Sequence, residues 1–282
     1  MGIKAIVMDV DGTLTNDKKE ITPKTREVLL KAQKQGILLI LASGRPTTGL
    51  VEMGKVLEMD KNNGLFISYN GSKVVNFQTG EELFNEPLKL EDAKAVLEHM
   101  KKFEIKPMID KGDYMYVNDV YNCMIRFRNE PFNVIKYESR GGNYKLCEID
   151  DLAAFIDYPL NKILTAGEPE YLQEHYIEMM EPFKDKLNCM FTGPFYFEFT
   201  AKDIDKAKAL DTVLKPLNIS ADEVIAFGDG HNDISIIKYA GIGVAMENAV
   251  SDLKEAADEI TLSNEQDGIA ESLLKNIPNL SV

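Results

Sequence analysis

Short runs of apolar residues without polar alternation mark the N-terminal part of the chain. They lie at residues 4–9, 37–41 and 65–69, and each predicts a strand that is buried on both faces of a parallel sheet. Between them, residues 22–36 and 51–57 carry apolar side chains at helical spacing. This order of strands and helices predicts the start of a doubly wound α/β sheet.

The pattern changes near residue 81. Residues 90–103 predict an amphipathic helix, and residues 114–117 and 124–127 predict short antiparallel strands in a region dense in aromatic residues. Because this pattern departs from the parallel rhythm on either side, we predict an inserted α/β domain over residues 82–190.

The parallel-sheet rhythm returns at residue 206. The predicted elements are a helix at 206–214, a strand at 224–227, a helix at 234–239 and strands at 242–245 and 259–262. The first and last segments are therefore expected to form one doubly wound core from residues 1–81 and 191–282. The middle segment would be a lid inserted into that core.

Charge and cysteine content limit the classes of partner and the cellular compartment that we expect. The chain carries 46 acidic and 32 basic side chains, a net charge of −14, which argues against a nucleic-acid partner and an acidic membrane surface. Any bound anion would need local positive charge from a metal or a lysine. The three cysteines form no CxxC pair, and the N-terminal apolar stretch is too short for a signal sequence. We therefore expect a cytoplasmic protein with reduced thiols.

Two carboxylates follow the first predicted strand, in the segment Asp9-Val10-Asp11-Gly12-Thr13. In an α/β sheet this end of a strand is where ligands bind. Two carboxylates 4 Å apart repel each other by on the order of 4 kcal/mol at an effective dielectric constant of 20. A divalent cation would offset this repulsion, or one carboxyl would keep its proton and act as an acid. The competing interpretation is an ordinary turn, since Asp and Gly are common turn residues.

A second polar segment, Ser43-Gly44-Arg45-Pro46, follows the second predicted strand. A hydroxyl group, a glycine amide and a helix N-terminus together can hold a phosphate. The alternative is a plain helix cap, in which Ser43 only accepts a hydrogen bond from the first turn.

A third segment, residues 228–233, follows the strand predicted at 224–227. Asp229 and Asp233 suit Mg²⁺, which takes one or two carboxylates and keeps several waters, and Asn232 could donate to a phosphate oxygen. Lys206, at a predicted helix start, could neutralise a phosphoryl oxygen as a point charge. The alternatives are a turn that begins a helix and a solvated surface lysine.

The four segments together resemble the haloacid dehalogenase superfamily of phosphohydrolases. The segment Asp9–Thr13 matches the first motif of that superfamily, Ser43 the second, Lys206 the third and residues 228–233 the fourth. The inserted domain is similar to a type IIB cap, and residues 243–249 resemble the Cof branch.

The resemblance implies an aspartyl-phosphate mechanism that uses Mg²⁺. Asp9 would attack phosphorus in line, and Asp11 would protonate the leaving alcohol and later take a proton from water. Asp9, the backbone carbonyl of Asp11 and Asp229 would hold Mg²⁺, with Asp233 in support. The implied substrates are small phosphorylated metabolites, with sugar phosphates foremost.

The same resemblance assigns the phosphate-binding groups. Ser43, Gly44, Lys206 and Asn232 would bind the non-bridging oxygens, where charge spreads in the transition state. Closure of the inserted domain would exclude water during the attack and select the leaving group.

Two alternative functions remain open on the sequence. A phosphomutase, such as a phosphomannomutase, would use the same aspartate and return the phosphoryl group to a sugar. A non-catalytic metabolite-binding protein would keep only the fold. Arg45 and Asn70 are further candidate substrate contacts, and we expect a monomer or a homodimer.

Overall fold

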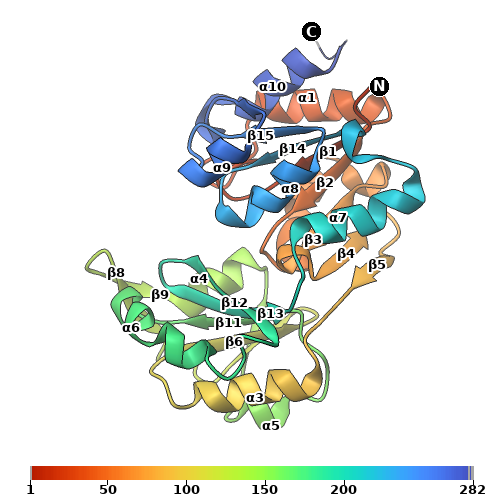
Figure 1. The fold of residues 1–282 in the computed structure, drawn as a ribbon. Coiled ribbons are helices and arrows are strands. Elements are labelled where there is room, and N and C mark those ends of the chain that lie inside the picture. The colour runs from red at the N-terminus through yellow and green to blue at the C-terminus, as the bar shows by residue number, and fades with distance from the viewer. Residues whose placement is uncertain (1, 279, 281–282) are drawn as a thin grey trace. The chain divides into compact units, whose positions relative to one another are not determined.

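The structure is a computed structural model that describes residues 2–278 and residue 280. It divides the chain into two compact units (Figure 1). The first unit combines the residues up to Phe84 with those from Asp205 onward, and the second is Asn85–Ile204. Among the described residues, no helix is long and apolar enough to cross a membrane.

The first unit contains an eight-stranded sheet in the order β16-β15-β14-β1-β2-β3-β4-β5. Its strands are β1 (Ala5–Met8), β2 (Leu38–Ala42), β3 (Leu65–Ser68), β4 (Lys73–Asn76), β5 (Glu82–Asn85), β14 (Val224–Gly228), β15 (Ile242–Ala245) and β16 (Glu259–Ile260). The pairings from β16 to β3 are parallel, and β4 runs antiparallel to β3. This arrangement confirms the predicted doubly wound α/β core.

Helices cover both faces of this sheet. They are α1 (Pro23–Lys34), α2 (Val51–Val56), α7 (Lys206–Leu214), α8 (Ile234–Tyr239), α9 (Ser251–Ala256) and α10 (Gly268–Asn276). Residues of α1 and α10 belong to one apolar cluster, and residues of α7, α8 and α9 belong to the other. In Figure 1, α1 and α10 lie side by side.

The central strand β1 explains why its sequence lacks polar alternation. Ile6 and Met8 point into the cluster with α1 and α10, whereas Ala5 and Val7 point into the cluster with α7 and α8. All four side chains are fully buried. A strand with helices on both faces needs apolar residues at every position, as the sequence predicts.

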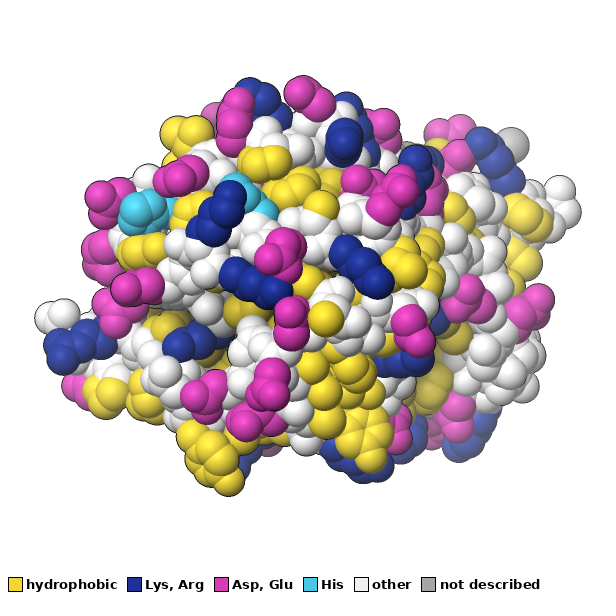
Figure 2. All heavy atoms as spheres, turned by 90° about the horizontal axis from the view of Figure 1, so that it is seen from below, with side chains coloured by type: hydrophobic (Ala, Val, Ile, Leu, Met, Phe, Trp, Pro, Cys, Tyr) yellow, Lys and Arg dark blue, Asp and Glu magenta, His cyan; other side chains and the backbone are white. Residues whose placement is uncertain are grey.

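The second unit contains a six-stranded sheet in the order β10-β7-β6-β11-β13-β12 and a separate hairpin of β8 and β9. Its strands are β6 (Lys106–Lys111), β7 (Tyr114–Val117), β8 (Met124–Phe127), β9 (Glu130–Asn133), β10 (Lys145–Glu148), β11 (Ile163–Ala166), β12 (Leu187–Gly193) and β13 (Tyr196–Ala201). Its helices are α3 (Leu90–Met100), α4 (Val134–Gly141), α5 (Leu152–Phe155) and α6 (Pro169–Met180). Acidic, basic and apolar side chains are interspersed on the face shown in Figure 2.

The chain returns to the first unit later than predicted, at Asp205 rather than at residue 191. The reason is strand pairing: β13 pairs antiparallel with β11, and β12 pairs antiparallel with β13. Residues 191–204 therefore belong to the second unit. The division after Phe84 lies three residues beyond the predicted boundary at residue 81.

Candidate active site

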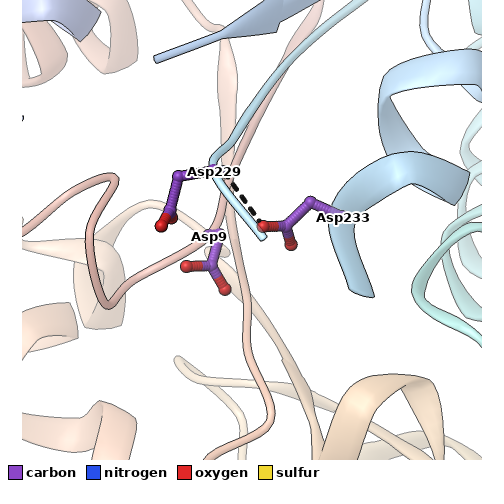
Figure 3. A group of neighbouring side chains, drawn as sticks. All are labelled: Asp9, Asp229 and Asp233. Atoms are coloured by element: carbon purple, nitrogen blue, oxygen red, sulfur yellow. Dashed lines mark hydrogen bonds between the residues drawn. The ribbon is translucent and has the colours of Figure 1, made fainter. Parts of the chain in front are cut away.

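Three acidic side chains converge at one end of the first unit's sheet. Asp9 directly follows β1, Asp229 directly follows β14, and Asp233 directly precedes helix α8. Since β1 and β14 are parallel neighbours, the residues after them lie together. One carboxylate oxygen from each residue lies within 4.8 Å of the others, and Figure 3 shows the three side chains gathered in one place.

Glycines give these carboxylates the space that they occupy. A Cβ atom on Gly12 would lie 2.4 Å from Oδ2 of Asp229, and one on Gly228 would lie 2.4 Å from Cβ of Asp233. Gly12 also has a φ of +87°, which favours glycine. Any larger side chain at either position would push a site carboxylate out of place.

Local hydrogen bonds then orient two of the acids. Thr13 Oγ1 donates to Oδ1 of Asp229 at 2.7 Å. The backbone amides of Asp229 and Gly230 donate to Oδ2 of Asp233 at 3.1 and 3.0 Å. The predicted turn role of this segment is therefore real, and the same turn aims Asp233 at the cluster.

Lys206 places one positive charge among the acids. Its Nζ atom donates to Asp9 Oδ1 at 2.7 Å, to Asp233 Oδ1 at 2.6 Å and to the carbonyl oxygen of Ala42 at 2.8 Å. The side chain is fully buried at the start of α7, where Asp205 Oδ1 accepts from the amide of Lys208. The alternative of a solvated surface lysine is wrong.

Burial and mutual repulsion govern the charge states. Burial raises the pKa of Asp9 well above its ordinary value, and repulsion from Asp233 adds to this despite the opposing charge of Lys206. Burial also raises the pKa of Asp229, to about 6, against the lowering effect of the Thr13 hydrogen bond. Burial alone would lower the pKa of Lys206, but Asp233 and Asp9 raise it above its ordinary value.

Asp11 has a different environment from these three acids. Arg45 donates to both of its carboxylate oxygens, from Nε at 2.6 Å and from Nη2 at 2.7 Å, and Lys19 Nζ donates at 2.7 Å. Burial would raise the pKa of Asp11, but the hydrogen bonds and charges of Arg45 and Lys19 lower it to about 2. Asp11 is therefore ionised at neutral pH in this arrangement.

The Ser43 segment leads into a helical turn. That turn begins at Thr47 with Pro46 as its N-cap, so a helix N-terminus does follow the segment, but the alternative in which Ser43 is a plain helix cap is wrong. Ser43 Oγ instead accepts from the amide of Arg45 at 3.2 Å.

Two asparagines join this loop to the β14 loop. Asn232 Nδ2 donates to Asn70 Oδ1 at 3.0 Å. A Cβ atom on Gly44 would lie 3.1 Å from the amide atoms of Asn70. The structure thus brings the four predicted phosphate-binding residues and Asn70 to the same end of the sheet as Asp9.

A family model of the haloacid dehalogenase-like hydrolases matches residues 6–273. The chain belongs to this family. The crystal structure of a haloacid dehalogenase-like hydrolase from Bacteroides thetaiotaomicron superimposes with a TM-score of 0.88 at 35% identity, over 97% of this chain and 99% of the other. TM0651 from Thermotoga maritima superimposes with a TM-score of 0.83 at 29% identity, over 97% of each chain.

A curated relative adds an activity. The Bacillus subtilis 5-amino-6-(5-phospho-D-ribitylamino)uracil phosphatase YcsE is 29% identical over 96% of this chain and 94% of its own. The family match and this similarity together identify the chain as a phosphatase within the haloacid dehalogenase-like hydrolases.

The acid cluster of this hydrolase fits a hard divalent cation. All three side-chain donors are carboxylate oxygens, which Mg²⁺ prefers. With three carboxylates ionised and Lys206 protonated, the group carries two net negative charges, which one divalent cation would balance. The carboxylate of Asp11 lies outside this group and pairs with Lys19 and Arg45.

Two contacts of the site were missed on the sequence. Lys19 lies in a loop with a φ of +63° and gives no motif signal; its only sequence cue is a positive charge eight residues after Asp11. Thr13 stands inside the quoted first motif, but its hydroxyl could not be paired with Asp229, 216 residues away, without the fold.

Proposed function

We propose that this hydrolase removes the phosphoryl group from small phosphorylated metabolites, with sugar and polyol phosphates as the preferred class and Mg²⁺ as cofactor. One observation carries the proposal. The carboxylate of Asp9 lies at the end of the central strand, bonded to the buried cation Lys206 and beside two further acids. A buried carboxylate in such surroundings is a candidate nucleophile for phosphoryl transfer.

The first step would use Asp9 as the nucleophile. An oxygen of Asp9 forms a bond to phosphorus while the bond from phosphorus to the ester oxygen breaks. Lys206 favours the ionised form of Asp9 against burial and against Asp233. A bound Mg²⁺ ion would supply electrostatic neutralisation of the carboxylates and of the phosphoryl oxygens.

Asp11 would move the protons in both steps. It gives a proton to the departing alcohol oxygen, and later accepts one from the water that releases phosphate from Asp9. The contacts with Arg45 and Lys19 favour the ionised carboxylate, which suits the second role. For the first role Asp11 must gain a proton, so these two cations must move away from it or turn to the substrate.

The phosphoryl oxygens would be bound by groups already in place. Lys206 contacts Asp9, and Asn70 contacts both Asn232 and Gly44 at the same end of the sheet. Donors fixed before the reaction stabilise developing charge without reorganisation. The polyol preference is supported by YcsE, whose name gives a substrate with its phosphate on a ribityl chain.

Phosphate release from a panel of esters tests this function. The panel contains sugar phosphates, polyol phosphates, nucleotides and pyridoxal phosphate, each with Mg²⁺ and with EDTA. We expect release that needs Mg²⁺, favours sugar or polyol esters and is lost in the Asp9→Asn variant. Release that persists in Asp9→Asn contradicts the nucleophile. Conversion of a hexose 1-phosphate to its isomer without free phosphate would favour a mutase instead.

A further inference from the structure

Three consecutive residues between β3 and β4 have left-handed backbone. The φ angles of Tyr69, Asn70 and Gly71 are +52°, +55° and +105°, and all three residues are buried. An aromatic residue rarely adopts a positive φ, and such strain persists only where surrounding contacts impose it. We therefore expect the contacts of this loop, residues 69–71, to hold its backbone in place.

The loop holds the Ser43 segment through its backbone. The amide of Asn70 donates to the carbonyl oxygen of Ser43 at 3.0 Å, and the amide of Tyr69 donates to the carbonyl oxygen of Arg45 at 3.0 Å. Both amides make these bonds while the loop holds its left-handed conformation. The path of residues 43–45 is thus fixed from a segment outside the recognised motifs.

The loop also lies against the helix start that supplies Lys206. A Cβ atom on Gly71 would be 2.2 Å from the carbonyl oxygen of Asp205 and 2.9 Å from the amide nitrogen of Lys206. Only glycine permits this approach, and it also permits the φ of +105°. The backbone position of Lys206 is therefore set by direct packing on residue 71.

The Asn70 side chain makes the third connection. Its Oδ1 atom accepts from Asn232 Nδ2 at 3.0 Å, across 162 positions of sequence. A primary amide has two N–H groups, and this bond uses one of them. The orientation of the second N–H of Asn232 is thereby fixed.

We propose that the loop 69–71 is the positioning element of the phosphoryl site, with Asn70 as the residue that aims the amide of Asn232. The inference rests on the proposed function and adds to it a residue that acts through another. The loop contacts all three segments that would bind the phosphoryl oxygens, so one small turn sets their mutual geometry. Misplacement of such a group by about 1 Å can reduce a rate by about 100-fold.

The variant Asn70→Gly isolates the side chain, because glycine keeps the backbone amide and adopts positive φ freely. We expect kcat to fall by about 10- to 100-fold with a smaller change in KM. The Tm should fall by only a few degrees, because the freedom of glycine at positive φ offsets part of the lost hydrogen bond. Asn218→Gly is the matched control: Asn218 is exposed and has a φ of +54° and a ψ of +40°, close to the +55° and +30° of Asn70. This control should keep the wild-type kcat.

A double variant tests whether Asn70 acts through its partner. If it does, Asn70→Gly combined with Asn232→Ala should lose no more activity than Asn232→Ala alone. Multiplied losses would overturn the assignment. So would an Asn70→Gly enzyme with the kcat of Asn218→Gly, or one whose loss is accompanied by a fall in Tm of more than a few degrees.

Binding of inorganic phosphate, measured by calorimetry with Mg²⁺, separates this inference from the proposed function. If the wild type binds phosphate but hydrolyses no ester, the proposed function fails, and the phosphate affinities of the variants still test whether Asn70 positions the site. Affinity reduced tenfold or more in Asn70→Gly, but not in Asn218→Gly, supports the inference. Equal affinities, or a wild type that binds no phosphate at millimolar concentration, overturn it.

Discussion

Lys206 is a buried cation that offsets the repulsion within the acid cluster, so its removal should destabilise the first unit. In Lys206→Met, the carboxylates of Asp9 and Asp233 lose their shared partner, and Nζ no longer donates to the carbonyl oxygen of Ala42. Breaking a buried ion pair by removing one partner costs about 3–5 kcal/mol. Methionine fills a similar volume, so the change tests charge more than packing.

Protonation gives a second estimate of this cost. Burial and repulsion from Asp233 raise the pKa of Asp9 even with Lys206 present, so in Lys206→Met we expect one carboxylate of the pair to take up a proton. Holding an aspartate protonated at pH 7 costs about 4 kcal/mol, from 1.36 kcal/mol for each pH unit above an ordinary pKa of 3.9. At pH 5 the same cost falls to about 1.5 kcal/mol. The folded-state pKa is raised, so the loss of stability grows as the pH rises above the unfolded value.

Differential scanning calorimetry in EDTA measures the effect. One kcal/mol shifts Tm by about 2–4 °C in a domain of this size, so we expect a loss of about 8–16 °C at pH 7 and about 3–6 °C at pH 5. Lys208→Met is the matched control, since Lys208 is exposed on the same helix, and its Tm should change by less than about 2 °C. A Lys206→Met protein with the wild-type Tm at pH 7, or with equal losses at both pH values, would refute the reasoning.

Three further predictions follow from the site. Mg²⁺ should raise the Tm of the wild type, and more at pH 7.5 than at pH 5.5, because a proton on Asp229, whose pKa is about 6, competes with the ion. The same Tm shift in Asp229→Asn would contradict Asp229 as a metal ligand. Arg45→Ala should cost about 1 kcal/mol in urea titrations at pH 7, and the cost should shrink as the pH falls from about 4 through 2, because Asp11 then takes up a proton in the folded state as well. A cost independent of pH would count against the ion pair. Gly71→Ala should lower the free energy of unfolding more than Gly80→Ala, because both glycines have positive φ but of the two only Gly71 would place its Cβ 2.2 Å from a backbone oxygen. Equal urea midpoints for the two variants would show that this close approach is unimportant.

The core and the acid cluster were predictable because they depend on local pattern and topology. Four apolar residues in succession at β1 require burial on both faces, and parallel neighbours bring the residues that follow them together. Asp9 and Asp229 could therefore be placed side by side without coordinates. Asp233 followed because it lies four residues further, where the turn after β14 returns its carboxylate to the backbone amides.

Side-chain direction and burial set the limit of sequence inference. The direction of the Arg45 side chain was not readable, because its guanidinium group bonds to Asp11, 34 residues earlier, and no local pattern specifies that pair. Its contact with substrate stays a prediction. The exposure of Lys206 was likewise unreadable, because a lysine at a helix start is usually solvated and only the fold buries this one. The left-handed loop gave only one cue, the Asn-Gly pair at residues 70 and 71.

The domain boundary was misplaced for a related reason. Residues 195–199 read Phe-Tyr-Phe-Glu-Phe, and such a short aromatic run predicts a strand but does not say to which sheet it belongs. That strand, β13, pairs with β11 and β12 of the second unit through long-range hydrogen bonds. Partner choice between sheets depends on the whole fold, so the sequence placed the return of the chain too early.

Chemical trapping of the intermediate tests the central claim most directly. The protein would be mixed with a substrate from the ester panel and Mg²⁺, quenched in acid during turnover and treated with borohydride, which reduces an aspartyl phosphate to homoserine. Peptide mass spectrometry then locates the reduced residue. We predict homoserine at position 9, in proportion to the intermediate present, and none in Asp9→Asn. Phosphate release with position 9 unmodified, or with another carboxylate reduced, would contradict the account.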